Sequence, residues 1–163
     1  MKQRSESELL HLAAAYCSSA ERCISDVQKK IISSGGTPEM AERMIPYLLK
    51  EKFIDESRFC RSFVNDKFRF NRWGRIRICF ELRKKGISPA IFAESIDSID
   101  EEKYTETLSE LLKSKKRTTK GRSKQEIFNK LYRFAAGRGF ENDVIIKRLN
   151  ALFKENFDAD DME

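Results

Sequence analysis

The sequence predicts an all-α protein made of three tandem three-helix, helix-turn-helix-like repeats in an elongated, curved row. Apolar residues recur at intervals of three and four along the 163 residues, only three prolines and seven glycines interrupt them, and strand-like alternation is absent. The segments 55–59 (Asp-Glu-Ser-Arg-Phe) and 100–104 (Asp-Glu-Glu-Lys-Tyr) also superpose at a separation of 45 residues. Such a period is typical of a repeat protein, in which each module buries its apolar face against its neighbours.

The first repeat is expected to span residues 1–54. Ser5 and Ser18 each begin an S/T-x-x-E capping box, which satisfies orphan amides at a helix start, and Thr37 stands before a proline at a first helical position. These three signals predict three helices. The candidate core residues are Leu9, Leu12, Ile24, Val27, Ile31, Ile45, Leu48 and Leu49.

The second repeat is expected to span residues 55–99. Asp55 is a candidate N-cap, and Ser88 precedes a proline where a further helix can begin. Between them Gly86 marks a helix end, because glycine adopts the left-handed conformation that stops a helix. The candidate core residues are Phe59, Phe63, Ile78, Leu82, Ile91 and Ile96.

The third repeat is expected to span residues 100–154, with Asp100 and Ser123 as N-caps. Residues 113–123 carry almost only polar and basic side chains and are interpreted as a mobile basic loop. Residues 155–163 are predominantly acidic and are interpreted as a disordered tail. The candidate core residues are Tyr104, Leu108, Leu111, Ile127, Leu131, Phe134, Val144 and Leu149.

Basic residues are concentrated in two stretches of a chain whose net charge is +6. Residues 58–87 hold ten basic and two acidic residues, and residues 113–138 hold ten basic residues and one acidic residue. Solvated helix faces account for many such runs, but this clustering favours a polyanionic partner.

Aromatic and basic residues alternate within residues 67–75 (Lys-Phe-Arg-Phe-Asn-Arg-Trp-Gly-Arg). This composition is found on surfaces that track phosphates and stack bases. Aromatic residues at helical spacing also commonly fill a core, so both interpretations stay open.

No catalytic or cofactor-binding motif is recognisable, and the sequence predicts a protein without enzymatic activity, cofactor or metal. The four cysteines form no CxxC pair, and His11, the single histidine, lies among leucines as a partly buried residue would. Residues 1–8 are too polar for a signal peptide, and no apolar run approaches the roughly 20 residues that span a bilayer. We therefore expect a cytoplasmic protein without membrane contact.

A sequence-specific helix-turn-helix repressor is an alternative, since each repeat ends in two helices joined by a glycine turn. Such proteins read base edges with Arg, Asn or Gln at the start of the second helix. Here the corresponding helices begin near Glu39, Ala90 and Asn142 with largely acidic and apolar residues. Contact with a nucleic-acid backbone or with an acidic protein is therefore favoured over base readout.

Several motifs follow one another along the chain at characteristic distances. Phe-Ile-Asp-Glu-Ser-Arg-Phe at 53–59 is followed by Gly-Arg-Ile-Arg at 74–77 and by Glu-Leu-Arg-Lys-Lys-Gly-Ile at 81–87. Lys-Leu-Tyr-Arg-Phe occurs at 130–134 and Arg-Gly-Phe at 138–140. Taken together, these motifs resemble those of the RecX family, in which the last two form the closing motif. The likeness extends over almost the whole chain, although the basic pair common before the middle helix of the first repeat is reduced here to Ser-Ala-Glu-Arg-Cys at 19–23.

The resemblance implies an inhibitor of the RecA recombinase. RecX proteins lie in the groove of the RecA filament on single-stranded DNA and suppress ATP hydrolysis and strand exchange, which modulates recombination, DNA repair and the SOS response. The expected partners are therefore the RecA filament and, weakly or indirectly, single-stranded DNA, bound by a monomer. The alternatives are a general nucleic-acid-binding helical repeat protein without a RecA partner, and a scaffold for an acidic protein.

The candidate partner-binding and DNA-binding residues are the cations of the two basic stretches. The middle repeat is expected to make the main electrostatic contact, and the loop at 113–123 an auxiliary phosphate contact. The candidates are Arg61, Arg69, Arg72, Arg75, Arg77, Lys84, Lys85, Lys115, Lys116, Arg117, Lys120, Arg133 and Arg138.

Overall fold

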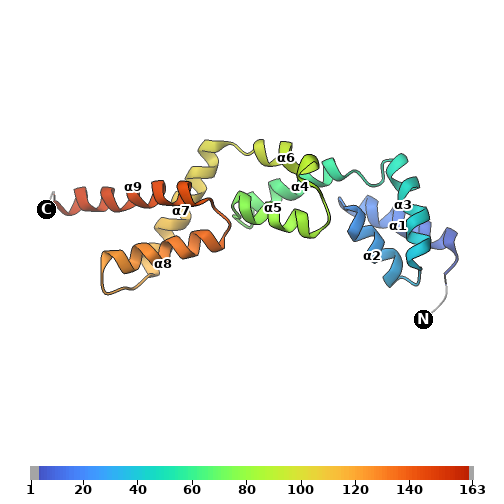
Figure 1. Cartoon of the computed structure of the whole chain (residues 1–163), viewed down its shortest axis with the longest axis horizontal. Coiled ribbons are helices and arrows are strands. Elements are labelled where there is room, and N and C mark those ends of the chain that lie inside the picture. The colour runs from blue at the N-terminus through green and yellow to red at the C-terminus, as the bar shows by residue number, and fades with distance from the viewer. Residues whose placement is uncertain (1–3, 162–163) are drawn as a thin grey trace. The chain divides into compact units, whose positions relative to one another are not determined.

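The computed structural model describes residues 4–161, with side chains described from 4 to 154, and every regular element in these residues is an α-helix (Figure 1). The all-α prediction is confirmed. The helices are α1 (Glu6–Ser19), α2 (Ile24–Ser33), α3 (Pro38–Lys50), α4 (Glu56–Arg69), α5 (Arg75–Lys84), α6 (Pro89–Asp97), α7 (Glu101–Thr118), α8 (Lys124–Gly137) and α9 (Asn142–Asp161).

Most of the helix starts lie where the local caps predict them. The side chains of five residues accept a hydrogen bond from a backbone N–H in the first turn, which satisfies amides that have no partner inside the helix. These confirmed caps are Ser5, Thr37, Asp55, Asp100 and Ser123.

The capping box predicted at Ser18 is wrong. Helix α1 continues through this position, and the Ser18 hydroxyl donates to the Ala14 carbonyl at 3.0 Å. The carboxylate of Glu21 is bound to Arg58, with 2.7 Å between Oε1 and Nε, instead of returning to the serine. Helix α2 begins only after Cys23, so the connection is longer than the sequence suggests.

The predicted basic loop at 113–123 is wrong in its first half, because α7 remains helical to Thr118. Lysine and arginine are good helix formers, and cations at a helix C-terminus interact favourably with the helix dipole. Only residues 119–123 connect α7 to α8. The predicted disordered tail at 155–163 is also wrong where it can be compared, because α9 stays helical to Asp161. No glycine or proline interrupts residues 155–161. Residues 162–163 lie outside the described residues.

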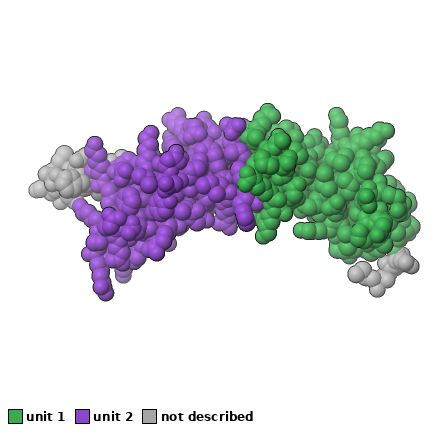
Figure 2. Space-filling view, viewed as in Figure 1, with its two compact units in different colours: residues 1–64, 81–95 green, residues 65–80, 96–163 purple. Residues whose placement is uncertain are grey.

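The chain divides into two compact units (Figure 2). The first unit holds the described residues of 1–64 and 81–95, and the second those of 65–80 and 96–163. Helices α4, α5 and α6 are each divided between the two units, whereas α1–α3 and α7–α9 each lie within one. The boundaries of the three repeats stay a prediction.

Each unit has an apolar core centred on its terminal three helices. The first core comprises Leu9, Ala13, Cys17, Val27, Ile31, Ala41, Met44, Ile45, Leu48 and Ile54. The second comprises Tyr104, Leu108, Leu111, Leu112, Leu131, Ala135, Phe140, Ile145, Leu149 and Leu152. Most of the core predictions hold, but Leu49 and Ile91 are exposed.

Candidate partner-binding surface

The first turn of α5 has no side-chain cap of its own, and its amides are satisfied by distant parts of the second unit. The N–H of Gly74 donates to the carbonyl of Arg138 at 2.8 Å, and the N–H of Ile76 to the carbonyl of Gly139 at 2.9 Å. The N–H of Arg75 donates to the hydroxyl of Tyr104 at 3.0 Å. We call this arrangement the α5 junction. It satisfies orphan amides with the turn that ends α8 and with the first turn of α7.

The α5 junction requires glycine on both sides because the two backbones touch. A Cβ atom on Gly74 would lie 2.4 Å from the carbonyl group of Gly139. A Cβ atom on Gly139 would lie 2.3 Å from the Cβ of Arg77, and the φ of Gly139 is +94°, which favours glycine. No side chain fits at either position without displacing backbone.

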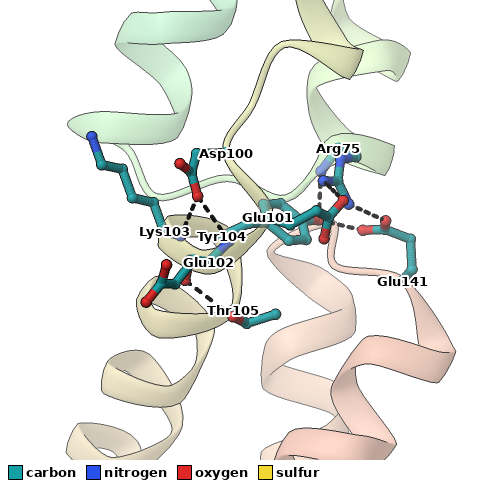
Figure 3. A network of polar contacts seen from close by, with 8 residues as sticks. All are labelled: Arg75, Asp100, Glu101, Glu102, Lys103, Tyr104, Thr105 and Glu141. Atoms are coloured by element: carbon teal, nitrogen blue, oxygen red, sulfur yellow. Dashed lines mark hydrogen bonds and ion pairs between the residues drawn. The ribbon is translucent and has the colours of Figure 1, made fainter.

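Arg75 is held inside the α5 junction by two carboxylates (Figure 3). Its Nη1 lies 2.9 Å from Oε2 of Glu141, its Nη2 pairs with Glu101, and its guanidinium lies 3.9 Å from the centre of the Tyr104 ring. The Tyr104 hydroxyl donates to Glu141. Only 18% of the Arg75 side chain is exposed, so its charge is largely neutralised within the chain.

The pKa values at this site follow from burial and from Glu141. Burial, followed by the hydrogen bond to Glu141, raises the pKa of Tyr104, so the phenol stays protonated and serves as a donor. Burial alone would lower the pKa of Arg75, but the hydrogen bond and charge of Glu141 outweigh it and the pKa is raised. Both raised pKa values keep Tyr104 and Arg75 protonated over the physiological range.

Trp73 is engaged by cations of its own unit. The Nζ of Lys67 lies 5.0 Å and the guanidinium carbon of Arg77 lies 4.2 Å from the centre of the indole ring. Both distances fall within the range of cation–π attraction. The half-buried indole is thus already covered in part, which weakens its interpretation as a platform for nucleic-acid bases.

Arg69 and Arg72 are the exposed cations among the candidates from residues 65–80. Arg72 has φ +55°, in the left-handed region, which costs a non-glycine residue about 1 kcal/mol. The neighbouring Phe70 is 74% exposed. This turn between α4 and α5 therefore presents an aromatic ring and two guanidinium groups to solvent.

The candidates of the first unit differ in their exposure. Arg61 and Lys84 are exposed, whereas Lys85 is half-buried, with its Nζ 3.1 Å from the Oδ1 of Asp26 and 5.7 Å from the centre of the Phe59 ring. The Lys85 charge therefore has an internal partner.

The candidates of the second basic stretch lie on α7, on α8, between them, or, for Arg138, at the C-cap of α8. Lys115 and Arg138 lie over the ring of Phe134, and Lys116 lies over the ring of Phe153. Arg138 also donates to the carbonyl of Asn71 at 2.8 Å. The remaining three are exposed: Arg117, Lys120 and Arg133.

The start of α2 forms a second junction, in the first unit, that the sequence analysis does not anticipate. The N–H of Ile24 donates to the Oε2 of Glu56 at 3.2 Å, and the N–H of Cys23 donates to the Oδ2 of Asp26 at 3.4 Å. Lys85 completes this α2 junction through its pair with Asp26. Here carboxylates, rather than backbone carbonyls, satisfy the amides of a helix start.

The pKa values at the α2 junction shift in opposite directions. Burial raises the pKa of Glu56. Burial would also raise that of Asp26, but hydrogen bonds from Cys23 and Lys85 outweigh it and the pKa is lowered.

Burial raises the pKa of the Cys60 thiol to about 11, so this cysteine is not a nucleophile at neutral pH.

The residues that the structure describes contain no cluster of His, Cys, Asp and Glu that could hold a metal ion. No two of the four cysteines form a disulfide. Within residues 4–161, none of the helices is both long enough and apolar enough to cross a bilayer.

The fold and its junctions define an all-α helical repeat protein. Two family models match it: the second three-helix domain of RecX at residues 55–96 and the third at residues 101–147. The chain belongs to the RecX family.

Curated relatives and solved structures agree with this assignment. The chain is 32% identical to the regulatory protein RecX of Clostridium tetani over 77% of its own length and 58% of the relative. It is 25% identical to that of Lactobacillus johnsonii over 99% of its length and 60% of the relative. The chain thus spans about three fifths of the length of these relatives.

The fold is similar to that of RecX from Lactobacillus salivarius, with a TM-score of 0.79 and 21% identity over 90% of this chain and 96% of that one. A second crystal structure, of regulatory protein RecX, has a TM-score of 0.81 and 20% identity, covering 89% of this chain and 73% of that one.

Proposed function

We propose that this protein is a regulator of RecA, binding the RecA filament on single-stranded DNA as a monomer in the cytoplasm and suppressing ATP hydrolysis and strand exchange. The observation that carries the proposal is the match of two successive RecX domain models along one chain. Regulation of this kind needs a binding surface but no chemistry, which suits a chain without a recognisable catalytic group.

The exposed cations are the candidates for the electrostatic contact. The exposed candidates are Arg61, Arg69, Arg72 and Lys84, whereas Arg75 and Lys85 are occupied by carboxylates of the chain. Charges that are already paired and partly desolvated contribute less to a partner than exposed ones. The main contact is therefore assigned to the exposed set, with Arg117, Lys120 and Arg133 as an auxiliary contact to phosphate.

Binding to nucleic acid without RecA is the second candidate function. The observation in its favour is the turn at 69–72, where an exposed phenylalanine stands between two exposed arginines. Aromatic rings and guanidinium groups together bind single strands with little sequence preference. The two functions differ in one measurable quantity, the preference for the filament over bare DNA.

The test is the single-stranded-DNA-dependent ATPase of the cognate RecA during titration with this protein. The wild-type chain should inhibit well below one copy per RecA protomer. The triple variant R69E/R72E/K84E should need roughly tenfold more protein or more for the same inhibition, because three exposed cations become anions.

The matched control is K29E/K50E/K147E, which makes the same change in net charge at three exposed lysines outside the candidate set. It should inhibit nearly as well as the wild type. Equal loss in both variants would mean that net charge alone governs binding, and equal inhibition by both would remove the contact assignment. Ordinary DNA binding without any effect on the ATPase would favour the second function.

A further inference from the structure

Helix α5 exposes two large apolar side chains that no core explains. Ile76 is 55% exposed and Phe80 is 61% exposed. They are four residues apart, and residues at this spacing lie side by side on one face of a helix. The opposite face of α5 buries Ile78 completely, so the helix has a core face and a separate apolar ridge. We call Ile76 and Phe80 the α5 ridge.

The segment that carries the α5 ridge is strongly basic. Residues 65–80 contain five cations and one acidic residue, Asp66. Arg77 adjoins Ile76 and precedes Phe80 by three residues, and Arg72 is kept in a left-handed conformation that glycine would adopt at lower cost. An occupant of the ridge therefore has to combine an apolar pocket with negative charge.

A second copy of this chain does not meet that requirement. Pairing of identical copies about a two-fold axis places a surface patch against itself. Glu101 and Glu141 balance Arg75, but Arg72 and Arg77 would then face the same arginines of the other copy. Charge repulsion therefore argues against self-association through this ridge.

A nucleic-acid strand also fits the α5 ridge less well than a protein does. Bases stack on aromatic faces, but of the two ridge residues only Phe80 offers one, and the nearby indole of Trp73 is already in contact with Lys67 and Arg77. Apolar side chains one helical turn apart are instead the usual anchors by which a helix enters an apolar pocket of a protein.

We propose that Ile76 and Phe80 insert into an apolar pocket on an acidic protein surface, while the neighbouring arginines bind carboxylates at its rim. This inference rests on the proposed function, in which that surface belongs to the RecA filament. It adds an apolar contact to an electrostatic one. Because apolar contacts are not screened by salt, part of the affinity persists at high ionic strength.

The test measures the affinity of the full chain for RecA filaments on single-stranded DNA, at low and at high salt, and in parallel its affinity for bare oligothymidylate. The variant I76S/F80S should lose roughly tenfold or more in filament affinity at both salt concentrations, because anchors in an apolar pocket dominate binding energy. Its affinity for bare DNA should be unchanged.

The matched control is I32S/Y47S, which replaces two apolar side chains of the first unit that are 44% and 48% exposed. It should bind the filament as the wild type does, with the helical content of both variants unchanged by circular dichroism. Self-association is followed by sedimentation of the wild type and of I76S/F80S.

The outcomes distinguish the apolar anchor from its alternatives. A loss of affinity that occurs only in I76S/F80S and only for the filament supports the apolar anchor. Undiminished filament binding by this variant overturns the anchor and leaves the proposed function standing. An equal loss on bare DNA identifies nucleic acid as the occupant, and wild-type dimers that the variant lacks identify a second copy; both overturn the inference. A wild-type chain that does not bind the filament overturns the proposed function itself.

Discussion

The α5 junction and the α2 junction solve the same problem with different groups. In both, an amide at the start of a helix is satisfied by a residue far along the chain, although Asp26, in the first turn of α2, also caps that helix locally. At the α5 junction the acceptors are mainly backbone carbonyls, held by two glycines in contact. At the α2 junction they are the carboxylates of Asp26 and Glu56, balanced by Lys85. The first is governed by shape and the second by charge.

This difference shows how each junction responds to its surroundings. Contact between two backbones leaves no space for a side chain but is insensitive to pH and salt. Carboxylates tolerate small displacements, yet their contribution to stability changes with protonation and ionic strength. We therefore expect mutations to damage the α5 junction most and solution conditions to affect the α2 junction most.

The largest effect is expected from Gly74→Ala. Its new Cβ would lie 2.4 Å from the backbone at Gly139, so the α5 junction has to open, at about 3 kcal/mol of unfolding free energy. The control is Gly137→Ala, whose Cβ meets nothing within 4 Å and which should be neutral or slightly stabilising. Denaturant unfolding of both variants tests this, and equal stabilities would show that the backbones can separate without cost.

An intermediate effect is expected from Tyr104→Phe. This change removes the acceptor of the Arg75 amide and the donor to Glu141 inside a buried site, and should cost about 2 kcal/mol. Tyr132→Phe removes an exposed hydroxyl that donates to Asn142 and should cost less than about 1 kcal/mol. Thermal unfolding of Tyr104→Phe and Tyr132→Phe measures the stability that the buried hydroxyl of the α5 junction contributes beyond an exposed one. Similar losses of stability in the two variants would contradict the importance of burial.

The smallest effect is expected from Glu56→Gln and depends on pH. As the pH falls through the raised pKa of Glu56, the folded chain takes up a proton before the unfolded chain does, so folding gains stability. As the pH falls further, through the lowered pKa of Asp26, the stabilisation by this carboxylate is lost. The wild type should therefore be most stable at mildly acidic pH.

Glu56→Gln should abolish the gain in folding stability on mild acidification and keep the loss of stability at lower pH. Both changes should stay below about 1 kcal/mol because the site is partly exposed. Denaturant midpoints across the acidic range measure the rise and the fall of stability. Asp26→Asn is the complementary variant and should abolish only the loss of stability at lower pH. A wild-type stability that does not vary above the range of Asp26 would argue against the burial of Glu56.

Local signals in the sequence predict much of the fold. Ser5, Thr37, Asp55, Asp100 and Ser123 each act on amides within their own first turn, so their position along the chain suffices. The box at Ser18 fails because a distant arginine takes the glutamate that it needs. Leu49 and Ile91 fit the helical period but are exposed, because they lie at the edge of the apolar face of their helices. The sequence period does not show how far the buried part of such a face extends.

The candidate site is less predictable, because the sequence shows which residues are basic but not which of them are paired with a carboxylate of the chain. Arg72 and Arg75 look alike in the sequence, yet one is exposed and the other is enclosed by Glu101 and Glu141. The α5 junction depends on residues more than 60 positions apart. Its only local signal is negative: the residues before α5, Trp73 and Gly74, include none of the side chains that commonly cap a helix.

The distances in sequence across the two junctions bear on folding during synthesis. The carboxylate that satisfies Ile24 follows it by 32 residues and the lysine that pairs with Asp26 follows it by 59, so the α2 junction can close before the residues that complete the α5 junction have emerged. Arg75 is translated 66 residues before Glu141, so its helix cannot complete its contacts until Glu141 has emerged. Of the two junctions, the α5 junction therefore closes later, and we expect chaperones to bind the basic and apolar surface of α5 in the meantime.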